Sequence, residues 1–141
     1  VVKITPSRFN QFLEEIKREG KSLNDMLAWG HAKAIEQVYS KVAAKKKGLH
    51  VTIVIDEFDK LKTEMRLKRV LELKDINVIQ KPRAEEEIAV AAASILARAG
   101  YERWIDMEST RTNVDLRSLS PFEALNRKDV ESLAKVSFLR K

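Results

Sequence analysis

The fold of this chain is decided by one stretch, HVTIVIDEFD at residues 50–59. From Val51 to Ile55 the residues are β-branched and almost all apolar, which is typical of a strand covered on both faces. Acidic residues follow at once, beginning with Asp56. Because helical patterns lie on both sides of this strand, the sequence predicts an α/β fold.

Toward the N-terminus, the sequence predicts one strand and two helices. Residues 1–4 are typical of a short strand. A helix over residues 5–20 opens with a threonine cap and a proline at the first helical position. A longer helix follows from Ser22 to about Lys46, with apolar residues at helical spacing.

Toward the C-terminus, strand and helix patterns alternate before a helical tail. Ser120 and Glu123 form a capping box with proline between them at the first helical position. The predicted elements are a helix over about 61–70, a strand over 75–80, a helix over 84–107, an irregular segment over 110–119, a helix from 121 and a last helical pattern over 130–137.

The composition indicates a folded protein. Its 141 residues are enough for one domain or most of one, and 44% are hydrophobic, which excludes a chain disordered throughout. Cysteine is absent, which excludes disulfides, thiolate metal sites and a cysteine nucleophile. The longest apolar run, residues 88–97, is far shorter than the ~20 residues that cross a bilayer. We therefore expect a soluble, cytoplasmic protein with no membrane partner.

The charge balance is basic, with 27 Lys and Arg against 21 Asp and Glu, a net charge of +6 and a pI near 9.6. A polyanion such as nucleic acid is the favoured partner, because neutralising phosphates releases condensed counterions. The alternative is a charged surface of the kind that thermophiles carry. The sequence contains neither a P-loop nor a Gly-rich dinucleotide motif.

Asp56 is the foremost candidate site residue. Ligands of α/β sheets gather at the carboxyl ends of strands, where a carboxylate can hold a metal ion or polarise a water. The alternative is that Asp56, or Asp59 after it, caps the next helix. The position alone does not decide between these two interpretations.

Three consecutive glutamates, at residues 85–87, lie in the first turn of the helix predicted over 84–107. The helix dipole favours negative charge there, which accounts for at least two of the three. The functional interpretation is that one of them faces Asp56 and completes a carboxylate site for divalent ions.

Basic residues flank these carboxylates. An acidic metal site with basic groups around it suits a phosphodiester substrate. The two histidines, His31 and His50, are isolated in the sequence and are assigned no role. The flanking basic residues are Lys60, Lys62, Lys81 and Arg83.

Three stretches carry a resemblance to a known family. They are NDMLAWGHAKAI at 24–35, VIDEF at 54–58, and AE at 84–85 followed by IAVAAASILAR at 88–98. In this order they resemble the long-helix signature, the strand that ends in a catalytic aspartate and the alanine-rich block of the type-2 ribonucleases H. Within this family, the sequence resembles ribonuclease HIII more than ribonuclease HII. The likeness covers residues 1–106 well and the tail loosely.

The resemblance implies a partial RNase H-like fold, with a mixed sheet flanked by helices and a C-terminal helical tail. It also implies an endonuclease that cleaves the RNA strand of RNA/DNA hybrids with Mg²⁺ or Mn²⁺. Asp56 matches a catalytic, metal-ligating aspartate and Glu85 the second carboxylate, with Asp59 as an alternative ligand. The family usually has one more residue between the second carboxylate and the alanines. The four flanking basic residues are then candidate contacts to nucleic acid.

The family's first catalytic motif, an Asp-Glu pair beside a Gly-rich turn, has no counterpart in this sequence. The chain therefore resembles the C-terminal portion of the enzyme, with residues 1–107 in the catalytic domain and 108–141 as a helical extension. The missing N-terminal part of the same enzyme is an expected partner. We expect the isolated chain to be inactive, because half a site should bind Mg²⁺ poorly. An exposed sheet edge could also pair with a second copy of the chain.

Two other functions stay open. The first is a non-catalytic nucleic-acid-binding or assembly module that keeps the RNase H-like fold. The second is a structural domain whose positive charge is only a thermophilic surface.

Overall fold

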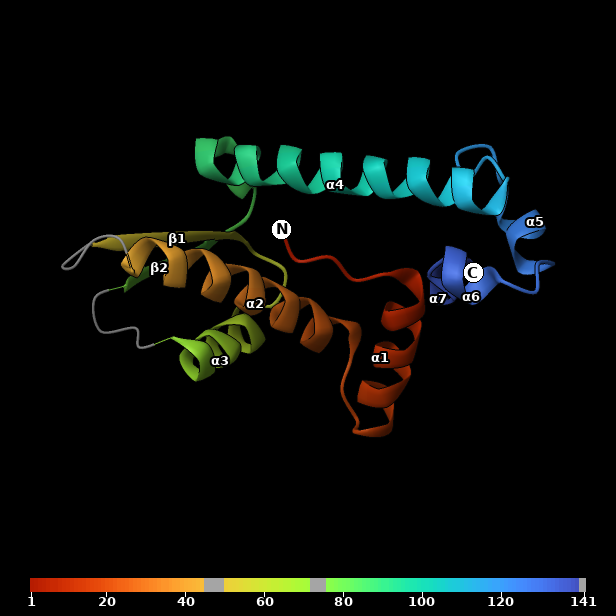
Figure 1. The fold of residues 1–141 in the computed structure, drawn as a ribbon. Helices are drawn as coiled ribbons and strands as arrows, with labels where there is room; N and C mark the ends of the chain where they lie inside the picture. The colour runs from red at the N-terminus through yellow and green to blue at the C-terminus, as the bar shows by residue number, and fades with distance from the viewer. Residues whose placement is uncertain (45–49, 72–75, 140–141) are drawn as a thin grey trace. The chain divides into compact units, whose positions relative to one another are not determined.

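The computed structural model describes residues 1–44, 50–71 and 76–139, and it confirms an α/β chain. The predicted ends at Lys46 and Asp75 lie outside the described residues. Along the chain (Figure 1) the elements are α1 (Pro6–Arg18), α2 (Leu23–Ala43), β1 (Val51–Asp56), α3 (Lys60–Val70), β2 (Ile76–Lys81), the 3₁₀ turn η2 (Ala84–Glu86), α4 (Ile88–Thr112), α5 (Pro121–Leu125), α6 (Val130–Leu133) and α7 (Val136–Leu139).

The chain divides into two compact units. One, which we call the sheet unit, comprises Lys21–Ile95 together with Val2. The other, the helical unit, comprises Lys3–Gly20 and Leu96–Lys141 together with Val1. The division into a catalytic part over 1–107 and an extension over 108–141 stays a prediction.

The sheet unit is built on two parallel strands. β1 pairs with β2 in register from Val51 opposite Ile76 to Asp56 opposite Lys81. Among the described residues this parallel pair is the whole sheet, so the mixed sheet implied by the resemblance is not present there. Parallel strands are joined by a crossover, and α3 supplies it here.

Helices α2 and α3 cover one face of this sheet (Figure 1). Alternation along β1 turns Ile53 and Ile55 toward the helices, while Thr52 is exposed. The prediction that both faces of this strand are covered is therefore wrong for the described residues. The buried cluster consists of Ala32, Ile53, Ile55, Leu67 and Leu71.

A polar network joins the N-terminal ends of α2 and α3. The Lys62 ammonium donates to Asp25 Oδ2 at 2.7 Å and to Ser22 Oγ at 2.9 Å. The Asn24 amide donates to Asp59 Oδ2 at 3.3 Å. Because Ser22 and Asp25 also form the capping box of α2, the caps of the two helices are tied together.

In the helical unit, one asparagine joins α1 to the segment around α6 and α7. Asn10 Nδ2 donates to the carbonyl oxygens of Glu131 at 3.0 Å and Ala134 at 2.9 Å. Its Oδ1 accepts from the Val136 N–H at 3.1 Å. Buried Phe9 packs on the same side, with its ring centroid 6.0 Å from that of Phe138.

The predictions for three elements are wrong. Residues 1–4 form no strand in the described structure. The last helical pattern is split, because Ala134 is extended and ends α6 before α7 begins. α4 begins only at Ile88, and it continues through Thr112 into the segment predicted to be irregular. The next residue, Asn113, has a left-handed φ of 52°, which suits the position directly after a helix.

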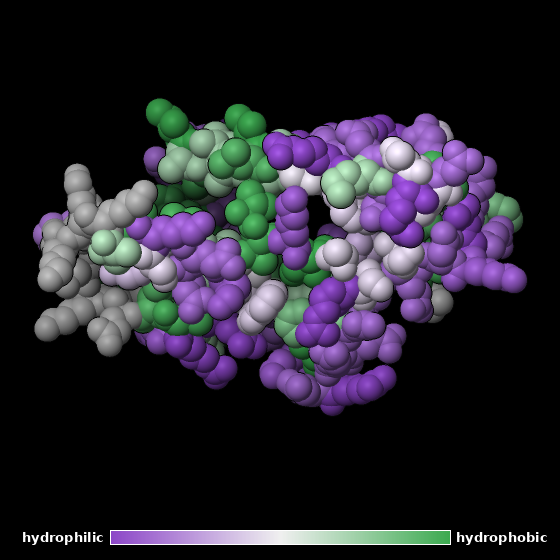
Figure 2. Space-filling model, viewed as in Figure 1, coloured by the Kyte–Doolittle hydropathy of each residue, from purple (hydrophilic) through white to green (hydrophobic). Residues whose placement is uncertain are grey.

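The first half of α4 carries exposed apolar side chains. Ile88 is 87% exposed and Ile95 is 70% exposed. Figure 2 shows apolar residues gathered over this part of the helix. None of the described helices combines the length and the apolar content needed to span a bilayer.

Candidate functional site

The site is centred on the carboxyl end of β1. Asp56 is the last residue of that strand, and its Oδ1 accepts from the Ala84 N–H at 3.3 Å. Ala84 is completely buried and begins the turn η2. The end of β1 and the turn after β2 therefore meet at the edge where parallel α/β sheets bind ligands.

The turn after β2 differs from the predicted helix start. Arg83 has left-handed φ and ψ of 57° and 38°, η2 spans Ala84–Glu86, and Glu87 is extended. The three glutamates therefore precede α4 rather than occupying its first turn. The contact with Asp56 is made by the Ala84 N–H of this turn, just before Glu85.

The three glutamates differ in their ion pairs. Glu86 pairs with Arg83 at 2.9 Å, and Glu87 pairs with Lys81 at 2.5 Å. Glu85 makes no ion pair with any residue that the structure describes. It follows Ala84 directly, and of the three it is the carboxylate left available beside the end of β1.

Asp59 acts as a helix cap. Its Oδ1 accepts from the Lys62 N–H at 3.1 Å, and its Oδ2 accepts from Asn24. Asp56 takes no part in capping α3 and bonds to Ala84 instead. The capping interpretation therefore describes Asp59, while Asp56 lies with the turn that contains Glu85.

The candidate basic residues differ in how they are engaged. Lys62 is held by Asp25, Lys81 by Glu87 and Arg83 by Glu86. The Lys60 ammonium has no ion pair within the described part of the chain. Lys60 is also exposed, so its ammonium can meet a phosphate without first leaving an ion pair with a described residue.

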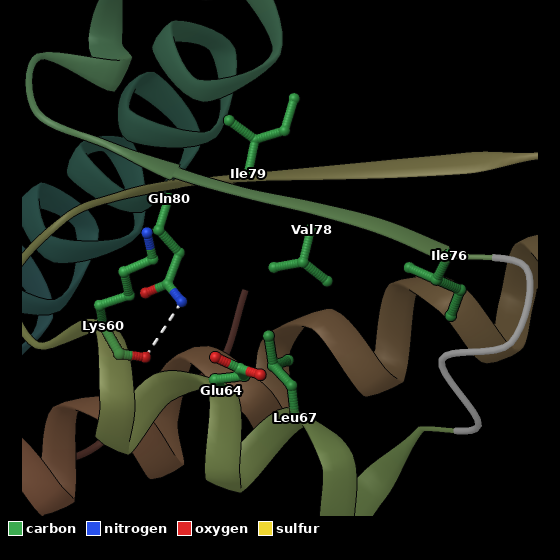
Figure 3. Close-up of a pocket in the computed structure, with 7 residues that line it drawn as sticks. All are labelled: Lys60, Glu64, Leu67, Ile76, Val78, Ile79 and Gln80. Atoms are coloured by element: carbon green, nitrogen blue, oxygen red, sulfur yellow. Dashed lines mark hydrogen bonds between the residues drawn. The ribbon is translucent and has the colours of Figure 1, made fainter.

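A cavity of about 460 Å³ lies between α3 and β2 (Figure 3). Gln80 Nε2 donates to the Lys60 carbonyl oxygen at 3.1 Å, and Gln80 Oε1 is buried without a partner in the described structure. Neither Asp56 nor Glu85 lines the cavity, which is therefore separate from the carboxylate site. Its walls are Lys60, Glu64, Leu67, Ile76, Val78, Ile79 and Gln80.

His31 is a neighbour of the site that the sequence did not reveal. Its ring centroid lies 5.1 Å from that of Phe58, two residues after Asp56. Desolvation lowers the pKa of His31, and the negative charge of Asp56 opposes this effect. Because His31 and Asp56 are 25 positions apart in the sequence, only the packing of α2 against β1 brings them together.

The two carboxylates fit part of a site for a hard divalent ion. Mg²⁺ and Mn²⁺ prefer oxygen ligands, which Asp56 and Glu85 supply. Within the described residues no group of three or more acidic or histidine side chains is placed to hold a metal ion. Further ligands would have to come from elsewhere.

Comparison with known proteins identifies relatives by sequence. The chain is 38% identical over 117 residues to "Ribonuclease HIII" of Protochlamydia amoebophila, a match covering 82% of the chain and 35% of that protein. It is 34% identical over 146 residues to "Ribonuclease HIII" of Chlamydia pneumoniae, covering 97% of the chain and 45% of that protein. "Ribonuclease HIII" of Chlamydia abortus is 37% identical over 118 residues, with 82% and 36% covered.

The chain thus spans less than half the length of the curated relatives it matches, and the matching part is their C-terminal portion. No protein-family profile matches the chain, and no solved structure matches it. The order of the three sequence stretches and the matches to several ribonucleases HIII both indicate the same family. Over the residues that are matched, the chain belongs to the ribonuclease HIII family.

Proposed function

We propose that this chain carries part of the active site of a ribonuclease H, a metal-dependent endonuclease that cleaves the RNA strand of RNA/DNA hybrids. The observation that supports it most directly is the hydrogen bond from the Ala84 N–H to Asp56 Oδ1. This bond brings the turn that contains Glu85 to the carboxyl end of β1. The relatives named ribonuclease HIII supply the reaction class.

Asp56 and Glu85 would be ligands of Mg²⁺ or Mn²⁺. Such an ion, when bound, activates water and stabilises the leaving oxygen of a phosphodiester. Asp56 is oriented for this role by the buried Ala84 N–H, and Glu85 is not committed to an ion pair in the described structure. Asp59 is the less suitable ligand, because both its oxygens already accept hydrogen bonds.

The rest of the site would come from the N-terminal part of the same enzyme. The curated relatives are more than twice as long as the segment they share with this chain, and two carboxylates alone bind Mg²⁺ poorly. The exposed residues Ile88 and Ile95 of α4 offer an apolar surface that this part could cover. A second copy of the chain, pairing through a free sheet edge, would be the competing occupant.

The basic residues around the carboxylates would contact the phosphates of the hybrid. Lys60 is ready to do so, since its ammonium is exposed and has no ion pair among the described residues. Lys62, Lys81 and Arg83 would first have to leave Asp25, Glu87 and Glu86. The pairs of Lys81 and Arg83 are exposed and therefore weak, so their exchange costs little. Lys62 is held more firmly by the less exposed Asp25.

The test is cleavage of a labelled RNA/DNA hybrid with Mg²⁺ or Mn²⁺. The chain is assayed alone and joined to the N-terminal part of the Protochlamydia amoebophila relative. We expect cleavage only by the joined protein. Robust cleavage by the isolated chain would contradict the split site, and no cleavage by either form would contradict the enzymatic function.

Matched variants of the joined protein assign the carboxylates. We expect Asp56→Asn and Glu85→Gln each to lower the cleavage rate by at least ~10²-fold, because each removes a charged metal ligand. Asp59→Asn is the control for Asp56, since asparagine also caps helices. Glu86→Gln and Glu87→Gln are the controls for Glu85, and we expect rates within a few-fold of the parent for all three controls.

The second candidate is a non-catalytic nucleic-acid-binding or assembly module. It is favoured by the net charge of +6, because a basic surface can bind a polyanion without cleaving it. Under this function Asp56→Asn leaves hybrid binding unchanged, and the joined protein binds without cleaving. Binding that does not weaken with added salt would instead favour a structural domain with a charged surface.

A further inference from the structure

Arg83 holds a backbone conformation that its residue type does not favour. Its φ of 57° and ψ of 38° lie in the left-handed region, where a Cβ atom crowds the following carbonyl. The other described non-glycine residue with positive φ is Asn113, and asparagine tolerates this region. Backbone strain of this kind persists only where the surrounding structure imposes it. The contacts around Arg83 must therefore provide the reason that it holds this conformation.

The side chain of Arg83 does not provide that reason. Its guanidinium pairs with Glu86, and the two side chains are 79% and 62% exposed. An exposed pair three residues apart contributes little to stability. What distinguishes Arg83 is its position, between Pro82 after β2 and the buried Ala84.

The left-handed conformation turns the chain back toward β1. Directly after it the Ala84 N–H donates to Asp56 Oδ1, and the Glu86 N–H donates to the Arg83 carbonyl oxygen at 3.2 Å. These two bonds hold both ends of a turn that contains Glu85. An extended or right-handed residue at position 83 would send the Ala84 N–H in another direction.

We propose that the left-handed backbone of Arg83, and not its positive charge, positions Glu85 beside Asp56. Arg83 is thus a positioning residue that acts through the Ala84 hydrogen bond. The inference deepens the proposed function and rests on it for the use of the two carboxylates. The geometry itself can be tested without substrate.

Three substitutions separate conformation from charge. Arg83→Gly and Arg83→Asn remove the guanidinium but allow the left-handed conformation. Arg83→Val also removes the charge, and its β-branched side chain disfavours this conformation strongly. If conformation is what matters, valine differs from the other two, whereas if charge matters all three behave alike.

The first readout is amide hydrogen exchange of the Ala84 N–H in the 141-residue chain, measured by NMR. We expect protection in the parent, Arg83→Gly and Arg83→Asn proteins, and a loss of about tenfold or more in Arg83→Val. Unchanged protection of the Ile53 and Ile55 amides of β1 shows that the valine variant is folded. Equal protection in all four proteins, or loss in the glycine and asparagine variants, would overturn the inference.

The second readout is Mn²⁺-induced broadening of the Asp56 and Glu85 amide signals. We expect Arg83→Val to need roughly 10-fold more Mn²⁺ for equal broadening, the size typical when a group supporting a ligand is lost. The glycine and asparagine variants should bind Mn²⁺ as the parent does, even if the valine variant does not fold. Weaker Mn²⁺ binding by these two variants would mean that the positive charge of Arg83 matters, and it would overturn the inference. Exchange in the expected order without any Mn²⁺ broadening in the parent would uphold the positioning role and contradict the metal site of the proposed function.

Discussion

Asp25 shows how single side chains connect the elements behind the candidate site. The Lys62 ammonium and the Ser22 backbone N–H both donate to its carboxylate. The hydrogen bond from Lys62, followed by that from Ser22, lowers the pKa of Asp25 from 3.8 to about 2. The charged form is therefore favoured in the folded state, and it helps to hold α2 against α3.

This pKa predicts a pH dependence of stability. Because the folded pKa lies below the unfolded value of 3.8, the contribution is complete above about pH 4 and is lost as the pH falls toward 2. We expect Asp25→Asn to lower the free energy of unfolding by ~1 kcal/mol at neutral pH, after allowing for solvent screening. Urea unfolding at pH 7 and at pH 2.5 measures the difference, which should shrink at the lower pH.

Glu36→Gln is the control for Asp25. Glu36 pairs with Lys33 three residues away on the surface of α2, a contact typically worth ~0.2–0.5 kcal/mol. An effect of Asp25→Asn no larger than that of Glu36→Gln would mean that the network does not join the two helices energetically.

At the scale of elements, the stability of α3 depends on the side chain that caps its N-terminus. Asp59 caps this eleven-residue helix through the Lys62 N–H and also accepts from Asn24 of α2. We expect Asp59→Ala to destabilise the chain by about 1 kcal/mol, as loss of a helix cap typically does, and Asp59→Asn to cost much less. Thermal unfolding of the two variants measures this, and equal losses would mean that the charge of Asp59 matters more than the cap.

The helical unit depends on a different contact. Asn10 satisfies three backbone groups at the junction of α6 and α7. We expect Asn10→Ala to destabilise the chain by about 2 kcal/mol, because three backbone groups, two of them in partly buried hydrogen bonds, lose their partner. Gln11→Ala, at an exposed position of the same helix, is the control. Hydrogen exchange should show the loss first at the Val136 amide, and loss confined to the sheet unit would contradict the assignment.

Local signals in the sequence predicted the elements whose ends depend on neighbouring residues. β1 ends at Asp56 as expected, and the capping box of Ser120 and Glu123 starts α5. The break in the last helix was not predictable, because Asn10, more than a hundred residues away in sequence, bonds to the groups at that break. The late start of α4 was missed because nothing in the residue type of Arg83 indicates a left-handed conformation.

The same distinction applies to the candidate site. The place of Asp56 directly after a strand is a local property that makes it a candidate ligand, and this role stays a proposal. The choice of Glu85 among three adjacent glutamates rested on the resemblance alone. In the structure Glu87 pairs with Lys81 and Glu86 with Arg83, and the role of Glu85 stays a proposal. The sequence alone assigns His31 no role for a similar reason, since only tertiary packing brings it near Phe58.

At the scale of the whole molecule, and under the proposed function, the net charge of +6 leads us to expect that binding to a hybrid depends on salt. Each phosphate neutralised by a lysine or arginine contributes about −0.9 to the slope of log K against log salt concentration. The whole charge does not count equally, because several cations already pair with acidic residues of the same chain. Lys60 has no such pair among the described residues, whereas Lys62 is held by Asp25.

We therefore expect Lys60→Ala to reduce the magnitude of this slope by about one and to weaken binding equally for hybrids of different sequence. Lys62→Ala should change the slope less, since its ammonium must leave Asp25 before it can meet a phosphate. Fluorescence anisotropy with a labelled hybrid at several salt concentrations measures both slopes. If the two variants behave alike, the pairing with Asp25 does not survive binding, and the basic surface near α3 acts as a diffuse charge. If neither changes the slope, the hybrid binds elsewhere, and the positive charge beside the carboxylates has another cause.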